Sequence, residues 1–131
     1  MRNKSKIIGV ILICGVILTS CSNQKKYDFS AVSDGGNVLF YKIVNNEVHI
    51  VPELQDFSKD NYTWYNNPPV GTLIIPEEIT HNGKTYNVTE IEDFSFCTCK
   101  IYDVIIPKTL RKIDPFSFSF CENLTYLNIQ E

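Results

Sequence analysis

The chain has 131 residues, of which 12 are Lys or Arg and 15 are Asp or Glu, so its formal net charge is −3 at pH 7. This length fits one domain of ordinary size, and the balance of 44% hydrophobic against 21% charged residues excludes a wholly disordered chain. The acidic total argues against a nucleic-acid-binding protein, which needs a basic face. Phe and Tyr together number 15, a composition that favours β-strands.

The N-terminus has the features of an export signal. Arg2, Lys4 and Lys6 precede an apolar segment, residues 7–18, that contains no charged residue. These 12 residues would span about 18 Å as a helix, whereas the hydrocarbon core of a bilayer is about 30 Å thick. A basic segment followed by a short apolar one is typical of a secretory signal, so residues 1–20 are expected to take no part in the fold.

The apolar segment ends at Leu18-Thr19-Ser20-Cys21, which resembles the cleavage motif of bacterial lipoproteins. The resemblance implies cleavage between Ser20 and Cys21, a diacylglyceryl thioether on the cysteine, and usually an acyl chain on the new amine. Two or more acyl chains hold a protein stably on a membrane, where one chain does not. The alternatives are an ordinary secretory signal with a chance cysteine, and an uncleaved anchor.

The residues after the cysteine bear on localisation. Ser22 stands where many Gram-negative lipoproteins of the inner membrane have Asp, so we expect a lipid anchor in the outer membrane, at the cell surface. Removal of residues 1–20 would take away three of the 12 basic residues and no acid, which leaves nine against 15 and a net charge of −6. Such a surface is repelled by anionic headgroups and nucleic acid. Residues 21–26 are therefore expected to be a polar tether on a lipid anchor.

Residues 27–70 are predicted to form an N-terminal β meander followed by a loop. The segments 27–32 and 38–44 flank a turn with two adjacent glycines. Asn45-Asn46 then provides a hairpin turn into the next strand, because Asn tolerates a positive φ. Residues 53–70 contain two prolines and show no periodicity, so we expect an irregular loop there.

From residue 71 onward the chain repeats itself. After a hairpin signal at Asn82-Gly83, the motif Phe94-Ser95-Phe96 recurs 22 residues later as Phe116-Ser117-Phe118. An apolar strand segment occurs three times, at residues 73–75, 104–106 and 127–129. A period of 22–23 residues predicts a solenoid in which each unit supplies one short strand and a return path, and stacks on the next unit.

The two repeats have the same types of residue in the same order. In the second repeat these are Ile113, Ser117-Phe118, Cys121, Leu124 and Leu127-Asn128-Ile129. In the first repeat, with one residue deleted after the cysteine, they are Ile91, Ser95-Phe96, Cys99, Ile101 and Val104-Ile105-Ile106-Pro107. This order resembles the BspA-like leucine-rich repeats of bacterial surface proteins. The resemblance implies a mainly β fold, with the antiparallel meander leading into a short solenoid of about two repeats over residues 71–131, and a function in adhesion or protein recognition, for instance of host or matrix proteins.

The number of repeats is small for a solenoid. Three or more are generally needed, because a terminal unit leaves an apolar face open. We expect the meander to cover the N-terminal side of the repeats. At the other side we expect partial exposure of five apolar side chains: Phe116, Phe118, Phe120, Leu124 and Leu127. A shortened member of the family, marginal stability, and self-association through the C-terminal repeat are the hypotheses for that end.

Cys97, Cys99 and Cys121 make an odd number for an exported chain. Cys99 and Cys121 occupy equivalent repeat positions, so a ladder of small buried side chains is the favoured interpretation. A disulfide between these two is one alternative. A metal site is the other, but the Cys-x-Cys spacing is shorter than in ordinary zinc sites and no fourth ligand is evident. We therefore predict neither a metal nor a cofactor.

Aromatic residues provide the candidate binding surface: Trp64, Tyr65, Tyr102 and Tyr126. Tyr and Trp give contact area at low entropic cost, although they can equally cover the edge of the core. The sequence has no Gly-x-Ser-x-Gly, His-Glu-x-x-His or phosphate-binding glycine loop, so an enzyme is not expected. The partner is then a host or matrix protein or, alternatively, a glycan or other nutrient captured by an accessory lipoprotein of the outer membrane.

Overall fold

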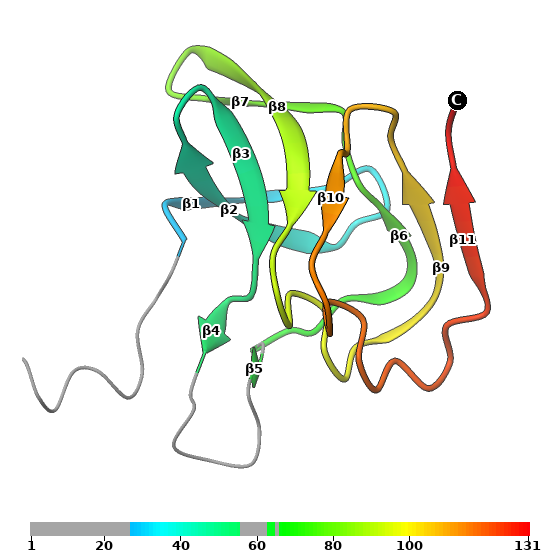
Figure 1. The fold of residues 1–131 in the computed structure, drawn as a ribbon. Helices are drawn as coiled ribbons and strands as arrows, with labels where there is room; N and C mark the ends of the chain where they lie inside the picture. Colours follow the sequence, from blue (N-terminus) through cyan, green and yellow to red (C-terminus); the bar gives the residue numbers. More distant parts are fainter. Residues whose placement is uncertain (1–26, 56–62, 65) are drawn as a thin grey trace, which may run out of the picture.

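The computed structural model describes residues 27–55, 63–64 and 66–131. All regular secondary structure in these residues is β, arranged in sheets of six, three and two strands (Figure 1). The mainly β fold predicted from the sequence is confirmed. The described part of the chain contains no apolar helix that would span a bilayer.

The N-terminal meander begins the larger sheet. β1 (Phe29–Val32) pairs antiparallel with β2 (Val38–Val44), and β2 pairs in the same way with β3 (Glu47–Val51). Asn45, in the turn between β2 and β3, has a φ of 57°, the left-handed conformation that Asn tolerates. Both hairpins predicted in this region are confirmed.

The loop predicted over residues 53–70 is wrong in part. β4 (Leu54–Gln55) and β5 (Thr63–Trp64) form a two-residue antiparallel ladder, and the next strand already begins at Val70. Strands of two residues are too short to carry a readable alternation of apolar and polar side chains. The sequence therefore had no signal from which this pair could be predicted.

The recurring apolar segments form a parallel sheet of their own. β6 (Val70–Ile74), β9 (Lys100–Ile106) and β11 (Tyr126–Ile129) lie side by side in the order β11-β9-β6 (Figure 1). The register pairs Ile129 with Ile106, a separation of 23 residues. The stacking of repeats predicted from the sequence period is confirmed.

The return path of each repeat contains a second strand, which the sequence did not predict. After the β7 (Glu78–His81) hairpin, β8 (Lys84–Ile91) pairs in parallel with β3 on one side and with β10 (Lys112–Ile113) on the other. Ile91 pairs with Ile113 at an offset of 22 residues and is fully buried. Because buried backbone needs hydrogen-bond partners, this segment also joins a ladder. Each repeat therefore contributes one strand to each of two sheets.

The turn between β1 and β2 caps the free edge of β6. The buried Asn37 amide donates to Val70 O at 3.1 Å and to Thr72 O at 3.2 Å, and its Oδ1 accepts from the Val70 N–H at 3.0 Å. Gly35 lies against the same strand, where a Cβ atom would come within 2.8 Å of Thr72 O. These contacts take the place of a neighbouring strand. The predicted covering of the N-terminal side by the meander is confirmed.

A bidentate ion pair also joins the meander to the repeats. The Arg111 guanidinium donates to the two Glu47 carboxylate oxygens at 2.9 and 2.6 Å. These hydrogen bonds hold the pKa of Glu47 below its ordinary value. Glu47 is in β3 and Arg111 directly precedes β10, so the pair spans the β8 strand that lies between them.

The core takes apolar side chains from both large sheets, among them Tyr41, Ile50, Leu73, Val88, Ile101 and Val104. Apolar side chains of the last repeat are less buried. Phe116, Phe120 and Leu127 are exposed, while Phe118 and Leu124 pack against the core and are only partly buried. The partial exposure predicted for these five side chains is confirmed.

Candidate binding site

Successive repeats stack their turns as well as their strands. One turn follows β8 and an equivalent turn follows β10. The Phe96 N–H donates to Ser117 O at 2.7 Å, and the Thr98 N–H donates to Ser119 O at 2.8 Å. The two turns are therefore bonded to each other along the solenoid, and side chains that project from them lie next to one another.

The small residue at the base of each turn is Ser95 or Ser117, and both are buried. The Ser95 hydroxyl lies 2.5 Å from Glu92 O, three residues earlier, and 3.0 Å from Ile50 O in β3. The Ser117 hydroxyl likewise lies 2.5 Å from Asp114 O and 3.2 Å from Glu92 O of the preceding repeat. Each hydroxyl is thus within hydrogen-bond distance of its own turn and of the preceding unit. Alanine would fit this space but would not form the hydrogen bond of the hydroxyl.

Four residues in these turns have a left-handed backbone. Phe94 and Phe116 have φ values of 59° and 63°, and Thr98 and Phe120 have values of 63° and 58°. Gly and Asn favour this conformation, and for other residues it costs roughly 1–2 kcal/mol. Phe116 and Phe120 are 62% and 74% exposed, so burial of their rings does little to offset this cost. Backbone strain that the fold maintains in this way is concentrated at functional sites.

The phenylalanine rings form an aromatic surface along the turns. Phe94 and Phe116 stack with their ring centroids 5.5 Å apart and their planes 8° from parallel. Together with Ser119 and Phe120 they line a concavity of about 480 Å³. We refer to Phe94, Phe116 and Phe120 as the phenylalanine ledge.

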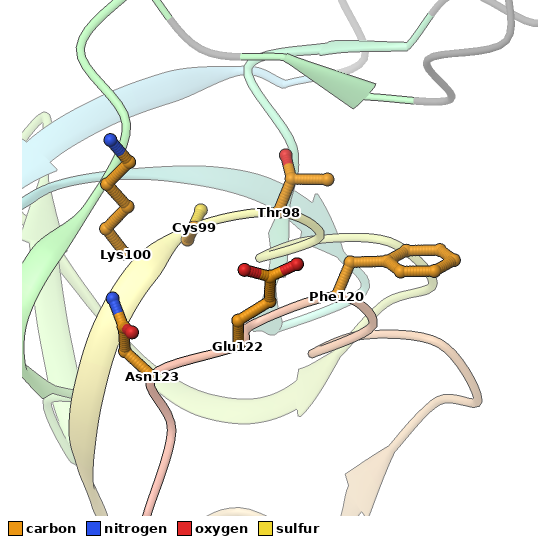
Figure 2. Close-up of a pocket in the computed structure, with 6 residues that line it drawn as sticks. All are labelled: Thr98, Cys99, Lys100, Phe120, Glu122 and Asn123. Carbon is orange, nitrogen blue, oxygen red and sulfur yellow. The ribbon is translucent and has the colours of Figure 1, made fainter.

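A second concavity, of about 340 Å³, adjoins the ledge because Phe120 lines both. It lies between the two repeats and is lined by Thr98, Cys99, Lys100, Phe120, Glu122 and Asn123. Figure 2 shows the Glu122 carboxylate and the Asn123 amide turned from the second repeat toward the first, with the Phe120 ring extending away at one end. We refer to this concavity as the polar pocket.

The polar groups of this pocket are available to a ligand. Among the described residues, the side chains of Lys100, Glu122 and Asn123 have no hydrogen bond or ion pair. They offer an ammonium donor, a carboxylate acceptor, and an amide that both donates and accepts. A volume of about 340 Å³ is within the usual range for ligand pockets, roughly 300–1,000 Å³.

Cys99 lies in the wall of the polar pocket, and both Cys99 and Cys121 are free thiols. Burial raises the pKa of Cys99 to about 12 and that of Cys121 to about 11. The Cys121 thiol donates to Phe96 O at 3.0 Å. These are properties of protonated, poorly reactive structural thiols. No group of three or more His, Cys, Asp or Glu side chains in the described part of the chain is placed to hold a metal ion.

Two of the aromatic residues proposed from the sequence lie on neighbouring strands. Tyr102 and Tyr126 are exposed on the neighbouring strands β9 and β11, where Tyr126 pairs with Asp103. We refer to these two tyrosines as the tyrosine face; neither lines the polar pocket. Trp64 is in β5, but its side chain lies outside the described residues, as do Tyr65 and the predicted lipidation site at Ser20 and Cys21.

Nothing in the sequence predicted the polar pocket. Lys100, Glu122 and Asn123 belong to no recognisable motif, and Phe120 was expected only as an exposed apolar side chain. One signal was present, because the period of 22 residues that aligns the repeats places Thr98 beside Phe120. It did not show that the ring would project outward from a left-handed backbone.

Comparison with known proteins agrees with the repeat fold. A family model described as "BspA type Leucine rich repeat region (6 copies)" matches residues 73–131. A leucine-rich repeat protein from Bacteroides ovatus ATCC 8483 is 26% identical, with a TM-score of 0.59, over 79% of this chain and 24% of that one. None of the curated proteins compared with the chain matches it.

Two further solved structures have the same fold. A leucine-rich repeat protein from Bacteroides capillosus ATCC 29799 is 19% identical (TM-score 0.56) over 78% of this chain and 66% of that one. A leucine rich cell surface protein from Faecalibacterium prausnitzii A2-165 is 24% identical (TM-score 0.54) over 82% of this chain and 25% of that one. The chain thus spans about a quarter of two of these proteins and about two thirds of the third. Residues 73–131 belong to the BspA-type leucine-rich repeat family, as their sequence predicted.

Proposed function

We propose that this chain is a lipid-anchored protein of the bacterial outer membrane whose repeats bind another protein at the cell surface, without catalysis. The BspA-type repeat region supports protein recognition in general. One protein of the same fold is described as a cell surface protein. The anchor is supported by the position of Cys21 directly after an apolar segment and small residues.

The observation that carries the recognition function is the tyrosine face. Tyr102 and Tyr126 are 53% and 72% exposed, although large aromatic side chains are usually more buried. Both are in strands of a three-stranded parallel sheet, so their backbones are held before a partner arrives. Exposed tyrosines on a rigid support give contact area at low entropic cost and are enriched at binding hot spots. Trp64 and Tyr65 remain part of this proposed surface.

Binding is tested with Tyr102→Ala and Tyr126→Ala in the full chain, measured by surface plasmon resonance against purified host and matrix proteins. Each substitution should weaken binding by about tenfold or more, as expected for a hot-spot residue. Lys108→Ala is the matched control, because Lys108 is exposed and its ion pair with Glu77 is a weak surface pair. Unchanged binding by both tyrosine variants would refute the tyrosine face.

The anchor and the location are tested separately. Mass spectrometry of the N-terminal peptide should find residues 1–20 removed and Cys21 carrying lipid, and Cys21→Ser should release the protein from membranes. Protease added to intact cells should digest the chain if it faces outward. An unmodified Cys21 contradicts the lipid anchor, and protection from the protease contradicts the surface location.

A different observation favours the alternative function, capture of a glycan by an outer-membrane accessory lipoprotein. It is the set of unpaired polar side chains in the polar pocket beside Phe120. Self-association is also proposed, because Phe116, Leu127 and Ile129 are exposed apolar side chains of the last repeat. Sedimentation of the purified protein tests it, and a monomer at high concentration contradicts it.

A further inference from the structure

We infer that the polar pocket and the phenylalanine ledge together form one site for a neutral oligosaccharide. This inference rests on the alternative function proposed above, capture of a glycan, and it uses none of the residues of the tyrosine face, so either proposal can fail without the other.

The shape indicates an elongated ligand of at least two sugar units. The two concavities, of about 340 and 480 Å³, meet at Phe120. Both lie along the stacked turns, whose backbones are bonded to each other from Phe96 to Ser117 and from Thr98 to Ser119. A linear oligosaccharide that extends from one concavity into the other would contact the phenylalanine ledge with one sugar unit and the polar pocket with the next.

The aromatic surface suits the flat apolar side of a pyranose ring. The negative face of an aromatic ring attracts weakly polarised C–H groups. Phe116 stacks on Phe94 with 8° between their planes, so one face of the Phe116 ring meets its neighbour, and the ring is still 62% exposed to a ligand. The Phe120 ring is largely exposed, although the left-handed backbone at this residue costs free energy. Contact between a ligand and the ring would offset that cost, which burial in the folded chain does not.

The polar groups suit neighbouring hydroxyls. The Glu122 carboxylate accepts two hydrogen bonds or more, the Asn123 amide both donates and accepts, and Lys100 donates. Because these groups have no partner among the described residues, a ligand hydroxyl would not have to displace an internal bond. A saccharide has donors and acceptors on adjacent carbons, and it combines them with an apolar face. An aliphatic or purely aromatic ligand would leave the polar groups of this pocket unpaired.

The charge indicates a neutral saccharide. Lys100 and Glu122 bring one positive and one negative charge to the same pocket. The whole chain carries a formal charge of −3, and −6 without residues 1–20, which disfavours sulfated or uronic-acid polymers.

The first test is a titration of the ¹⁵N-labelled full chain with cellotetraose, xylotetraose, maltotetraose and chitotetraose, followed by NMR. At least one of these neutral tetrasaccharides should shift the amide signals of residues 98–100 and 119–123, and heparin should not. The inference is overturned if none of the four shifts these signals at millimolar concentration. It is also overturned if the shifts map to Tyr102 and Tyr126, or if heparin or a peptide library binds here in place of the sugars.

The second test uses calorimetry with the tetrasaccharide that binds. Phe120→Gly removes the ring and relaxes the backbone, and Glu122→Gln removes the charged acceptor while keeping the size of the side chain. Each should raise the Kd by about tenfold, the value of one charge-assisted hydrogen bond or one stacking contact. Lys108→Ala is the control, because Lys108 is exposed and lines neither concavity, and it should change the Kd by less than about twofold. A wild-type Kd in both Phe120→Gly and Glu122→Gln, with thermal melting that shows folded protein, would overturn the inference.

Discussion

Replacement of Asn37 by Ala tests how the meander closes the repeats. The Asn37 side chain is 7% exposed and forms three hydrogen bonds of 3.0–3.2 Å with Val70 and Thr72, on the edge of β6. Each such bond contributes about 0.5–1.5 kcal/mol, and the loss also leaves backbone groups of β6 without their partners. We expect the free energy of unfolding to fall by about 2–4 kcal/mol.

The measurement is urea and thermal unfolding followed by circular dichroism. For a domain of this size, a loss of 1 kcal/mol lowers Tm by about 4–8 °C, so Asn37→Ala should melt at least about 8 °C below the wild type. Asn37→Asp separates the contributions, because it keeps an oxygen for the Val70 N–H but loses both donors and places a carboxylate beside two carbonyl groups. It should be destabilised at least as much at pH 7.

The matched control is Asn128→Ala, since Asn128 is exposed in β11, the outer strand of the same sheet. This change should alter the free energy of unfolding by less than about 0.5 kcal/mol. The reasoning is refuted if Asn37→Ala also remains within that limit. Equal losses from the two substitutions would show instead that the sheet tolerates no asparagine replacement, and that the Asn37 hydrogen bonds have no special value.

Three more predictions concern the turns and thiols. Phe120→Gly should raise the free energy of unfolding by about 0.5–1 kcal/mol in thermal melts, because relief of a left-handed backbone exceeds the added entropy of the unfolded chain; a loss would show that the exposed ring stabilises the fold. Ser95→Ala and Ser117→Ala should each lower the free energy of unfolding, measured in urea, by about 1 kcal/mol through one lost buried hydrogen bond. An unchanged free energy would show that only the small size of these serines matters. Since the pKa values of Cys99 and Cys121 are raised from 9.0 to about 12 and about 11, the unfolded chain loses these protons first, so stability should fall as pH rises above about 9 and be constant between pH 7 and 8.5. A flat profile up to pH 10.5 would contradict the burial of these thiols.

The parts of the fold predicted from the sequence depend on local chemistry. The hairpin at Asn82-Gly83 follows from two residues that accept a positive φ, and their φ values are 51° and 76°. The parallel sheet of β6, β9 and β11 follows from a repeated apolar segment, because equivalent residues of successive units stack. In both cases the information lies in short sequence segments.

The parts that were not predicted depend on contacts between distant segments. Asn37 reaches Val70 and Thr72 across 33 and 35 residues, and in the sequence it is only one more polar residue after a glycine turn. The pairing of β3 with β8 was not predicted either, because neither segment has a residue pattern that identifies the other as its partner. Tertiary packing selects these contacts from many that have the same local propensity.

The candidate site has a third origin, which is the difference between the two repeats. Residues that support the fold are equivalent in both: Ser95 and Ser117, Phe96 and Phe118, Cys99 and Cys121. Apart from Cys99, the polar pocket is lined by positions at which this equivalence fails. Phe120 in the second repeat replaces Thr98 of the first, and Glu122-Asn123 replaces Lys100, where the first repeat has one residue fewer. In a solenoid the repeated positions serve stacking, so the positions that depart from the repeat are free to serve binding. Restoring the repeat, with Phe120→Thr and Glu122→Lys, should therefore leave the fold intact and remove the sugar site.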